Sequence, residues 1–562
     1  MSEEGKRALI AAVRKVVIAG LILLVVWLIL LALRGTIPTS VIDQINQQYK
    51  NPVSYNSATW DWSRSLLRDQ TVASMIGQYL GNTLSLIALI GLMSLIIAGI
   101  LLFIGALIRR ITKGPGWLVK LRGILRLILV SGGASIPLFG FSTILMFTNW
   151  WHLGMQLNSV GILFWSAFVV SFLPAWLLVQ TGHGIMAKSD GNLADFHLSR
   201  EVSMRLLIRM LMLVGLVIGV AILAEENVAQ PGLGGLLMSG IFSRDFPIVV
   251  GVAWVFVIIV VLIKMTAGLL EVAYDYSQKY PSSAEQVKKE SPLRFAIPKG
   301  WLIFSLALVM LIILVAIFAP LLAPYGMNEI HLMDRLSSPS AKYLLGTDQL
   351  GRDILSRLLY GIRIDVLIGL FCTIVLSVVA AGWGTLAAYF RKMNNWLGDI
   401  LEDIVMLPRE IICSFPWLVL LLFLLSLMTG TGIIPVALTA GLVMLPRATG
   451  MIQEAYRSAP YGISWLQGVL KAIPVVFFFT TAGVIIYVST ASYLGFGIPP
   501  GTSELGNILS SEGRQYLFNA PWIGRWPSLC LIFIILFWMM AGDALLERLG
   551  FRSKAVWSKT ME

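Results

Sequence analysis

Long runs of apolar residues, separated by short polar connections, recur along the whole chain. Many runs hold about 18 or more residues without a charge, enough for a helix to cross a hydrocarbon core of roughly 30 Å. A helix satisfies its own backbone polar groups where no water is present. The pattern predicts an all-α polytopic membrane protein with about 12 transmembrane helices. The expected runs are 16–34, 80–108, 127–149, 160–182, 206–224, 247–270, 301–324, 365–390, 411–428, 433–446, 472–492 and 527–546.

A polar stretch interrupts this pattern near the middle of the chain. Residues 276–298 contain charges, serines and two prolines without an apolar period, which is typical of a linker. Equal numbers of apolar runs lie on its two sides. We therefore expect a first transmembrane half at 1–275, a cytoplasmic linker at 276–298 and a second half at 299–562. The first external loop is expected at 35–79, followed in the second half by loops at 325–364 and 493–526.

A short internal repeat indicates that the two halves share an architecture. The sequence at 233–239 recurs in similar form at 505–511, and each copy precedes the last apolar run of its half. Both halves are expected to begin and end on one side of the membrane, so the repeat is parallel and related by an axis along the membrane normal. A substrate route would then lie between the halves.

Composition and charge support a membrane protein. Hydrophobic residues make up 57% of the chain and charged residues only 13%, whereas a soluble domain carries about 25% charged residues. The net charge of +12 falls mainly on the side that holds both termini. The positive-inside rule assigns that side to the cytoplasm. The basicity thus reflects topology and requires no nucleic-acid partner.

The sequence lacks the residue patterns that enzymes of the common classes use. A phosphate-binding P-loop, a zinc-binding His-Glu-x-x-His helix and a nucleophile elbow are all absent from it. The four histidines are scattered without ligand spacing, and Cys372, Cys413 and Cys530 stand far apart in apolar runs. We therefore expect no catalytic residue, no metal site and no cofactor in this chain. The chain is expected to move a solute and not to convert one.

Some ionisable residues fall in or near the apolar runs, where a charge is costly unless it is functional. All but Lys264 lie within about a turn of an expected boundary, so snorkelling and inexact boundaries account for most of them. A proton or sodium relay in a secondary carrier remains an alternative. The residues concerned are Lys264, Asp365, Arg409, Glu410, Asp543, Glu225 and Glu226.

The most specific segment spans 345–361. Thr347 or Asp348 can cap a helix whose leucine and isoleucine residues form one face, opposite Arg352 and Arg357, and Gly361 can end it. Such an amphipathic helix is expected to lie along the outer interface and not to cross the membrane.

The polar residues of this segment resemble a family signature. They match the Gly-Thr-Asp-x-x-Gly-Arg-Asp pattern of the second permease subunit of dipeptide, oligopeptide and nickel ABC importers, and the resemblance continues through 493–500 and 505–516. Residues 70–275 are similar to the partner permease, mainly at 230–237 and 243–251. The resemblance implies a type I importer fold in which two permease subunits are fused. The external signature consists of Gly346, Thr347, Asp348, Gly351, Arg352 and Asp353.

The resemblance also implies coupling loops and partners. Two ABC ATPase subunits or domains would dock on the cytoplasmic face and carry ATP and Mg²⁺, while an extracytoplasmic binding protein would deliver the solute. The chain would lie in a prokaryotic cytoplasmic membrane, with both termini on the cytoplasmic side. The coupling positions implied are Ala194 and Asp195 in the first half, and Glu454, Ala455, Gly462 and Pro474 in the second.

The expected function is therefore that of a transmembrane permease in an ATP-driven importer of peptides or similar small solutes. Two alternatives remain open at this point. One is a 12-helix secondary carrier driven by an ion gradient, and the other is a non-transporting membrane scaffold derived from a permease. Sequence does not identify the solute or the residues that line its path.

Overall fold

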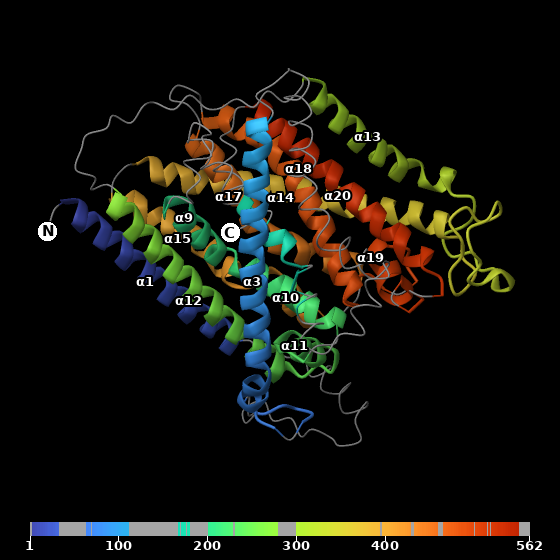
Figure 1. Ribbon diagram of the computed structural model, residues 1–562, viewed down its shortest axis with the longest axis horizontal. Helices are drawn as coiled ribbons and strands as arrows, with labels where there is room; N and C mark the ends of the chain where they lie inside the picture. Colours follow the sequence, from blue (N-terminus) through green and yellow to red (C-terminus); the bar gives the residue numbers. More distant parts are fainter. Residues whose placement is uncertain are drawn as a thin grey trace.

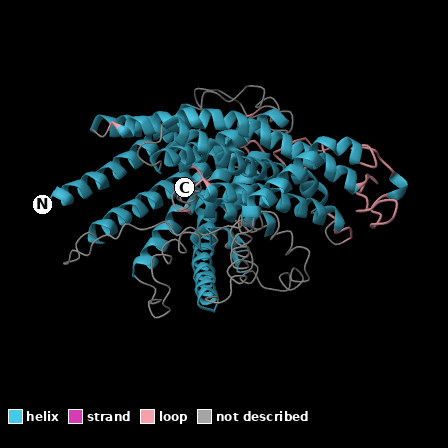
Figure 2. Cartoon of the chain, turned by 90° about the horizontal axis from the view of Figure 1, so that it is seen from above, coloured by secondary structure: helices cyan, strands magenta, loops and turns pink. Residues whose placement is uncertain are grey.

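The structure is a computed structural model that describes most of the chain. All the regular secondary structure in its described part is helical, apart from isolated bridges between Arg64 and Thr71 and between Thr347 and Asp353. Figure 2 shows these helices joined by loops. The expected run at 127–149 lies outside it, and the run at 160–182 is described only in part. The described residues are 3–32, 63–68, 70–111, 164, 167–168, 170–175, 177–179, 200–228, 231–278, 299–393, 396–428, 432–458, 465–499, 501–513, 515–516 and 519–549.

Eight helices of the described part are long and apolar enough to cross a membrane, or up to ten if each of two bent pairs forms one span. The all-α polytopic fold class is thereby confirmed, while the number twelve stays a prediction. In the first half the helices are α1 (Glu3–Ala32), α3 (Val72–Ile111), α9 (Arg200–Met212), α10 (Val214–Val228), α11 (Leu233–Phe242) and α12 (Phe246–Gln278).

The second half continues the helical architecture. Its elements are α13 (Lys299–Leu322), η4 (Leu332–Asp334), α14 (Ile354–Lys392), α15 (Trp396–Ser414), α16 (Trp417–Leu427), α17 (Ile433–Ser458), α18 (Trp465–Tyr493), α19 (Leu505–Ile508), η5 (Leu509–Gly513) and α20 (Trp522–Arg548).

Two expected crossings are bent. The run expected at 206–224 is divided between α9 and α10, which meet at 61°. Residues 396–410, which precede the run expected at 411–428, form most of α15. α15 and α16 then meet at 90°. Phe415 and Pro416 separate them, and proline disrupts helix continuation because it lacks an N–H.

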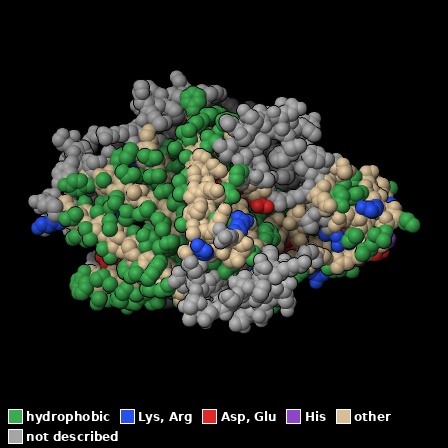
Figure 3. Space-filling view, turned by 90° about the horizontal axis from the view of Figure 1, so that it is seen from below, with side chains coloured by type: hydrophobic (Ala, Val, Ile, Leu, Met, Phe, Trp, Pro, Cys, Tyr) green, Lys and Arg blue, Asp and Glu red, His purple; other side chains and the backbone are tan. Residues whose placement is uncertain are grey.

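The outer helices present apolar side chains to their surroundings. Ile303 and Leu321 on α13 are 67% and 80% exposed, and Phe371 on α14 is 69% exposed. In Figure 3, apolar side chains cover most of one end of the described surface, whereas charged groups collect toward the end that holds the connection between α13 and α14. Large exposed apolar faces of this kind are what a lipid-facing surface requires.

Each half has its own packing arrangement. In the second half α14, α17 and α18 contact one another, α20 packs on α18 and α14, and α13 packs on α14 and α20. Trp538 is fully buried there, with Phe477 and Phe478 around its ring. In the first half α1 lies beside α12, as Figure 1 shows, while α3 contacts α10 and α11.

The halves meet along α15 and α16. α16 of the second half contacts α10, α11 and α12 of the first, and α15 contacts α1 and α12. An ion pair joins them, since Nε of Arg14 on α1 lies 2.6 Å from Oδ2 of Asp403 on α15. We expected a solute route between the two halves. Described helices of both halves contact each other there.

Candidate functional site

The signature residues 346–353 form a compact turn that leads into α14. Gly346 and Gly351 have φ values of +84° and +75°, in the left-handed region that favours glycine. A Cβ at Gly351 would lie 1.8 Å from the carbonyl oxygen of His331. The two glycines therefore let the chain turn tightly against the segment before it.

Asp348 is the centre of this turn and is completely buried. Its Oδ1 accepts hydrogen bonds from the backbone N–H groups of Leu350 at 2.8 Å and Arg352 at 2.9 Å. Its Oδ2 lies 2.6 Å from Nε of Arg352 and 2.6 Å from an Nη of Arg357. One carboxylate thus pairs with two buried guanidinium groups, and such charge-assisted bonds are stronger than those between neutral groups.

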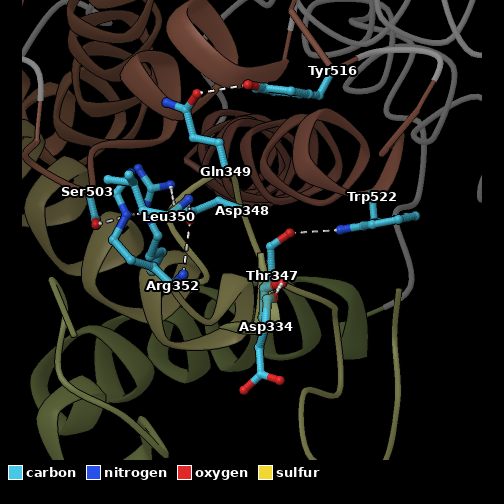
Figure 4. A network of polar contacts seen from close by, with 10 residues as sticks. Asp334, Thr347, Asp348, Gln349, Leu350, Arg352, Ser503, Tyr516 and Trp522 are labelled. Atoms are coloured by element: carbon cyan, nitrogen blue, oxygen red, sulfur yellow. Dashed lines mark hydrogen bonds and ion pairs between the residues drawn. The ribbon is translucent and has the colours of Figure 1, made fainter. Parts of the chain in front are cut away.

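Side chains from distant segments close around the turn. The indole N–H of Trp522 donates to the carbonyl oxygen of Thr347 at 3.1 Å, and the hydroxyl of Tyr516 donates to Oε1 of Gln349 at 3.0 Å. Figure 4 shows both rings pointing toward the turn. Arg357 reaches the hydroxyl of Ser503 at 3.3 Å. We call residues 346–357 and these partners the signature clasp.

The clasp differs from the expected amphipathic helix. The helix starts only at Ile354 and continues through Gly361 to Lys392, so the prediction that it lies flat along the interface and ends at Gly361 is wrong. Asp353 caps it, since its Oδ2 accepts from the N–H of Ser356 at 2.7 Å. Arg352 and Arg357 point inward and are buried, because Asp348 supplies the charge that makes their burial tolerable.

The clasp borders an exposed ion pair and a buried acid. Nζ of Lys342 and the hydroxyl of Tyr343 both donate to Asp334, and these bonds lower the pKa of its carboxyl group. Glu504 follows Ser503 and is fully buried, and burial raises the pKa of its carboxyl group. The buried carboxyl group of Asp365 on α14 lies beside it.

A buried carboxylate also binds the start of a short helix in each half. Glu504 accepts from the N–H groups of Gly506 at 2.9 Å and Asn507 at 2.7 Å at the start of α19. In the first half Glu225 accepts from the N–H of Gly234 at 2.7 Å at the start of α11. A negative charge is favourable there, because the first N–H groups of a helix have no partner within it.

The expectation that ionisable residues near the runs snorkel to a boundary is wrong for three of them. Glu225, Asp365 and Asp543 are 2%, 1% and 6% exposed and lie inside the protein. Glu225 accepts a hydrogen bond from Thr83 of α3 at 2.6 Å. Protein side chains, and not the membrane surface, thus solvate this group. Sequence could not show this, because the partner is 142 positions away.

The implied coupling positions are only partly within the described residues. Ala194, Asp195 and Gly462 lie outside them. Glu454 and Ala455 belong to the last turn of α17, which ends at Ser458, and Pro474 lies within α18. The described positions among them thus belong to long helices of the second half.

A small cavity of about 30 Å³ lies between the halves. Helices of both halves line it, and two of its lining side chains are basic, Lys264 on α12 and Arg447 on α17. Nζ of Lys264 donates to the carbonyl oxygen of Cys413 at 3.2 Å. We call it the interface cavity. Its lining residues are Met212, Gly215, Leu216, Lys264, Ile412, Cys413, Phe415, Trp417, Leu420, Val443 and Arg447.

Sequence reasoning included Lys264 but missed Arg447. The run expected at 433–446 stops one residue before Arg447, so this residue looked like an ordinary boundary charge. α17 in fact continues to Ser458. The useful signal was the apolar or small residues on both sides of the arginine, such as Leu445, Ala448 and Met451.

Comparison with known proteins gives evidence that does not depend on the structure. Residues 301–339 match a family described as the N-terminal TM domain of oligopeptide transport permease C. The chain is 31% identical over 301 residues to the di/tripeptide transport system permease protein DppC of Pseudomonas aeruginosa (strain UCBPP-PA14), which covers 49% of this chain and 95% of that protein.

Two further relatives give the same picture. The chain is 28% identical to the dipeptide transport system permease protein DppC of Haemophilus influenzae, over 46% of this chain and 97% of that protein. It is 30% identical to the glutathione transport system permease protein GsiD of Pectobacterium atrosepticum, over 44% of this chain and 85% of that protein. Each relative thus aligns over most of its own length to less than half of this chain.

The helical fold and these similarities define a multi-pass membrane protein of solute transport. The chain belongs to the family of ABC importer permeases that includes these relatives. The resemblance read from the signature residues is therefore confirmed, and the secondary-carrier and scaffold alternatives are not favoured. The half-length alignments agree with a chain that joins two permeases.

Proposed function

We propose that this chain is the whole transmembrane part of an ABC importer for peptides or similar small solutes. In this proposal residues 1–275 and 299–562 are two fused permease units, and 276–298 connects them. The relatives are named as permeases for dipeptides, di/tripeptides and glutathione, which supports small peptides as the class of solute. The solute would cross between the halves.

The observation that carries this proposal is a shared arrangement of helices. Thr83 and Asp365 occupy the twelfth position of α3 and α14, and each lies beside the buried carboxylate at the start of a short helix. The repeated Gly234 and Gly506 donate to these carboxylates. A long helix, α12 or α20, follows in each half. The same arrangement thus occurs once in each half, and this duplication supports fusion of two related units.

The proposed mechanism uses partners for energy. Two ATPase subunits with ATP and Mg²⁺ would hydrolyse ATP, and their closure would push on the coupling segments at the cytoplasmic face. Rigid-body movement of one half against the other would then expose the interface cavity alternately to each side. An extracytoplasmic binding protein would deliver the solute. The proposed coupling residues are Ala194, Asp195, Glu454, Ala455, Gly462 and Pro474.

The location follows from the same proposal. The chain would lie in a prokaryotic cytoplasmic membrane with both termini inside. The excess of Lys and Arg on the terminal side supports this orientation. The signature clasp would then lie on the outer side, near the bound binding protein.

Uptake into proteoliposomes tests the function. The purified chain, its ATPases and its binding protein are reconstituted, and accumulation of labelled di- and tripeptides is followed with ATP on the ATPase side. ATP-dependent accumulation is expected, and it should vanish when a hydrolysis-deficient ATPase is used. Accumulation that follows a proton or sodium gradient without ATP would overturn the proposal in favour of a carrier. The absence of uptake under every condition would favour a scaffold.

A further inference from the structure

The interface cavity has the features of an anion site. We propose that Lys264, Arg447 and the indole of Trp417 form a subsite for a carboxylate group of the solute, such as the free C-terminus of a peptide. This inference deepens the proposed function and rests on it. It assigns a preference for a carboxylate group to the interface cavity, which would lie on the solute path.

The position of the two basic residues is the first argument. At about 1.5 Å per residue, Lys264 lies about 27 Å along α12 from Phe246, and Arg447 lies about 21 Å along α17 from Ile433. Both positions lie within candidate membrane spans, Lys264 twelve residues before the end of Phe246–Tyr276 and Arg447 six residues before the end of Ile433–Gln453. Two cations from opposite halves at one cavity repel each other and are costly to bury. Such residues mark solute or ion pathways in membrane proteins.

The second argument concerns the hydrogen-bond donors and acceptors of the cavity wall. The guanidinium of Arg447 lies over the ring of Tyr487, with its carbon 5.6 Å from the ring centroid, and its Nε is buried. Neither this Nε nor the buried Nε1 of Trp417 has an acceptor among the described residues. No Asp or Glu occurs among the residues that line the cavity. An anion would supply acceptors and negative charge together.

Lys264 also has a structural role that must be separated from binding. The carbonyl oxygen of Cys413 is among the last of α15, where carbonyl groups lack partners within the helix, and a lysine donates to such groups favourably. This contact explains Lys264. It does not explain the unpartnered nitrogens of Arg447 and Trp417, which belong to the other half of the cavity wall.

The volume sets what the subsite can hold. A cavity of about 30 Å³ has room for about two water molecules. The two oxygens of one carboxylate can take those places. The rest of a peptide does not fit while the halves are packed as observed, so the site would be filled when they move apart. Binding of the charged end would then be coupled to that movement.

Direct binding is tested on the full chain in lipid nanodiscs, without ATPases. The melting temperature is measured with N-acetyl-trialanine and with its C-terminal amide, which differ only in the carboxylate. The acid should raise the melting temperature more than the amide does, because a ligand that binds the folded state stabilises it. Arg447→Gln should abolish this difference. Arg447→Lys, which keeps the charge, should retain part of it.

A matched control removes a positive charge elsewhere in the first half. Lys15 pairs with Glu271 at 3.3 Å and does not line the cavity. Lys15→Gln should therefore keep the difference between acid and amide. Equal effects of acid and amide on the unmodified chain would overturn the proposal, as would an undiminished difference in Arg447→Gln.

Transport supplies a second readout. In the reconstituted importer, Arg447→Gln and Lys264→Gln should each raise the KM for peptides with a free C-terminus by about tenfold and leave the KM for the amides unchanged. Equal changes for both kinds of peptide would overturn the subsite. A specific acid effect on melting in a chain that imports no peptide would keep the subsite and refute the proposed function.

Discussion

The signature clasp and the interface cavity both bury arginine, but they do so in opposite ways. In the clasp, Arg352 and Arg357 share the carboxylate of Asp348, which also accepts two backbone N–H groups. In the cavity, no acidic side chain lines the wall around Arg447, and its Nε has no acceptor among the described residues.

The difference separates a structural centre from a binding centre. A buried polar network that satisfies its own members stabilises one arrangement and offers nothing to a ligand. A site with donors in excess is incomplete until an anion arrives. The clasp joins the starts of α14 and α20 within one half, whereas the cavity lies between halves that are proposed to move.

Removal of the central carboxylate should have the largest effect. Asp348→Ala leaves two buried guanidinium groups without their shared partner, and breaking a buried pair in this way costs about 3–5 kcal/mol. The free energy of unfolding in nanodiscs, from denaturant titration, measures the loss. Asp334→Ala, which removes a half-buried carboxylate that accepts from Lys342 and Tyr343 beside the clasp, is the control and should lose much less stability. Similar losses in both variants would contradict the assigned role of Asp348.

The tight turn should give the next largest effect. In Gly351→Ala the new Cβ combines a left-handed backbone with a collision against the carbonyl oxygen of His331, and we expect a loss of about 1–3 kcal/mol. Gly501 has a φ of +100° but no atom within 4 Å of an added Cβ. Gly501→Ala thus tests backbone strain alone, and it should lose less stability. Equal losses would mean that packing at His331 is unimportant.

Substitution of two tryptophans should have the smallest effect on stability, and it compares the clasp and the cavity directly. Trp522→Phe removes an N–H that donates to Thr347 in the clasp, and a lost hydrogen bond of this kind costs about 1 kcal/mol. Trp417→Phe removes an N–H with no acceptor among the described residues, so it should cost less than about 0.5 kcal/mol. Unfolding of both variants is compared under the same conditions. A larger loss of stability in Trp417→Phe than in Trp522→Phe would contradict the distinction between the clasp and the cavity.

Sequence reasoning predicted the helical class because lipid imposes one solution on the backbone. It also found the family through the residues of 346–353. It assigned the wrong local structure to them, because Leu350 and Ile354 have helical spacing while the glycines impose a turn. The inward orientation of Arg352 depends on contacts that close in three dimensions, such as the one with Asp348.

Long-range contacts explain the other differences. Glu225 and Asp365 were assigned to boundaries because a single charge in an apolar run gives no sign of its partner. Thr83 donates to Glu225, and Glu504 lies beside Asp365, and both come from distant positions in the sequence. Arg447 was missed for the related reason that a helix boundary is the least certain feature of a hydropathy pattern.

The ion pair between Arg14 and Asp403 has a consequence for synthesis of the chain. The two residues are 389 positions apart, and at about 5–20 residues per second a ribosome needs about 20–80 s to make the second after the first. Lys15 meets its partner Glu271 earlier, because only 256 positions separate them. α1 can therefore pack against α12 before α15 exists, and the contact with Asp403 forms only after about two fifths of residues 299–562 have been made.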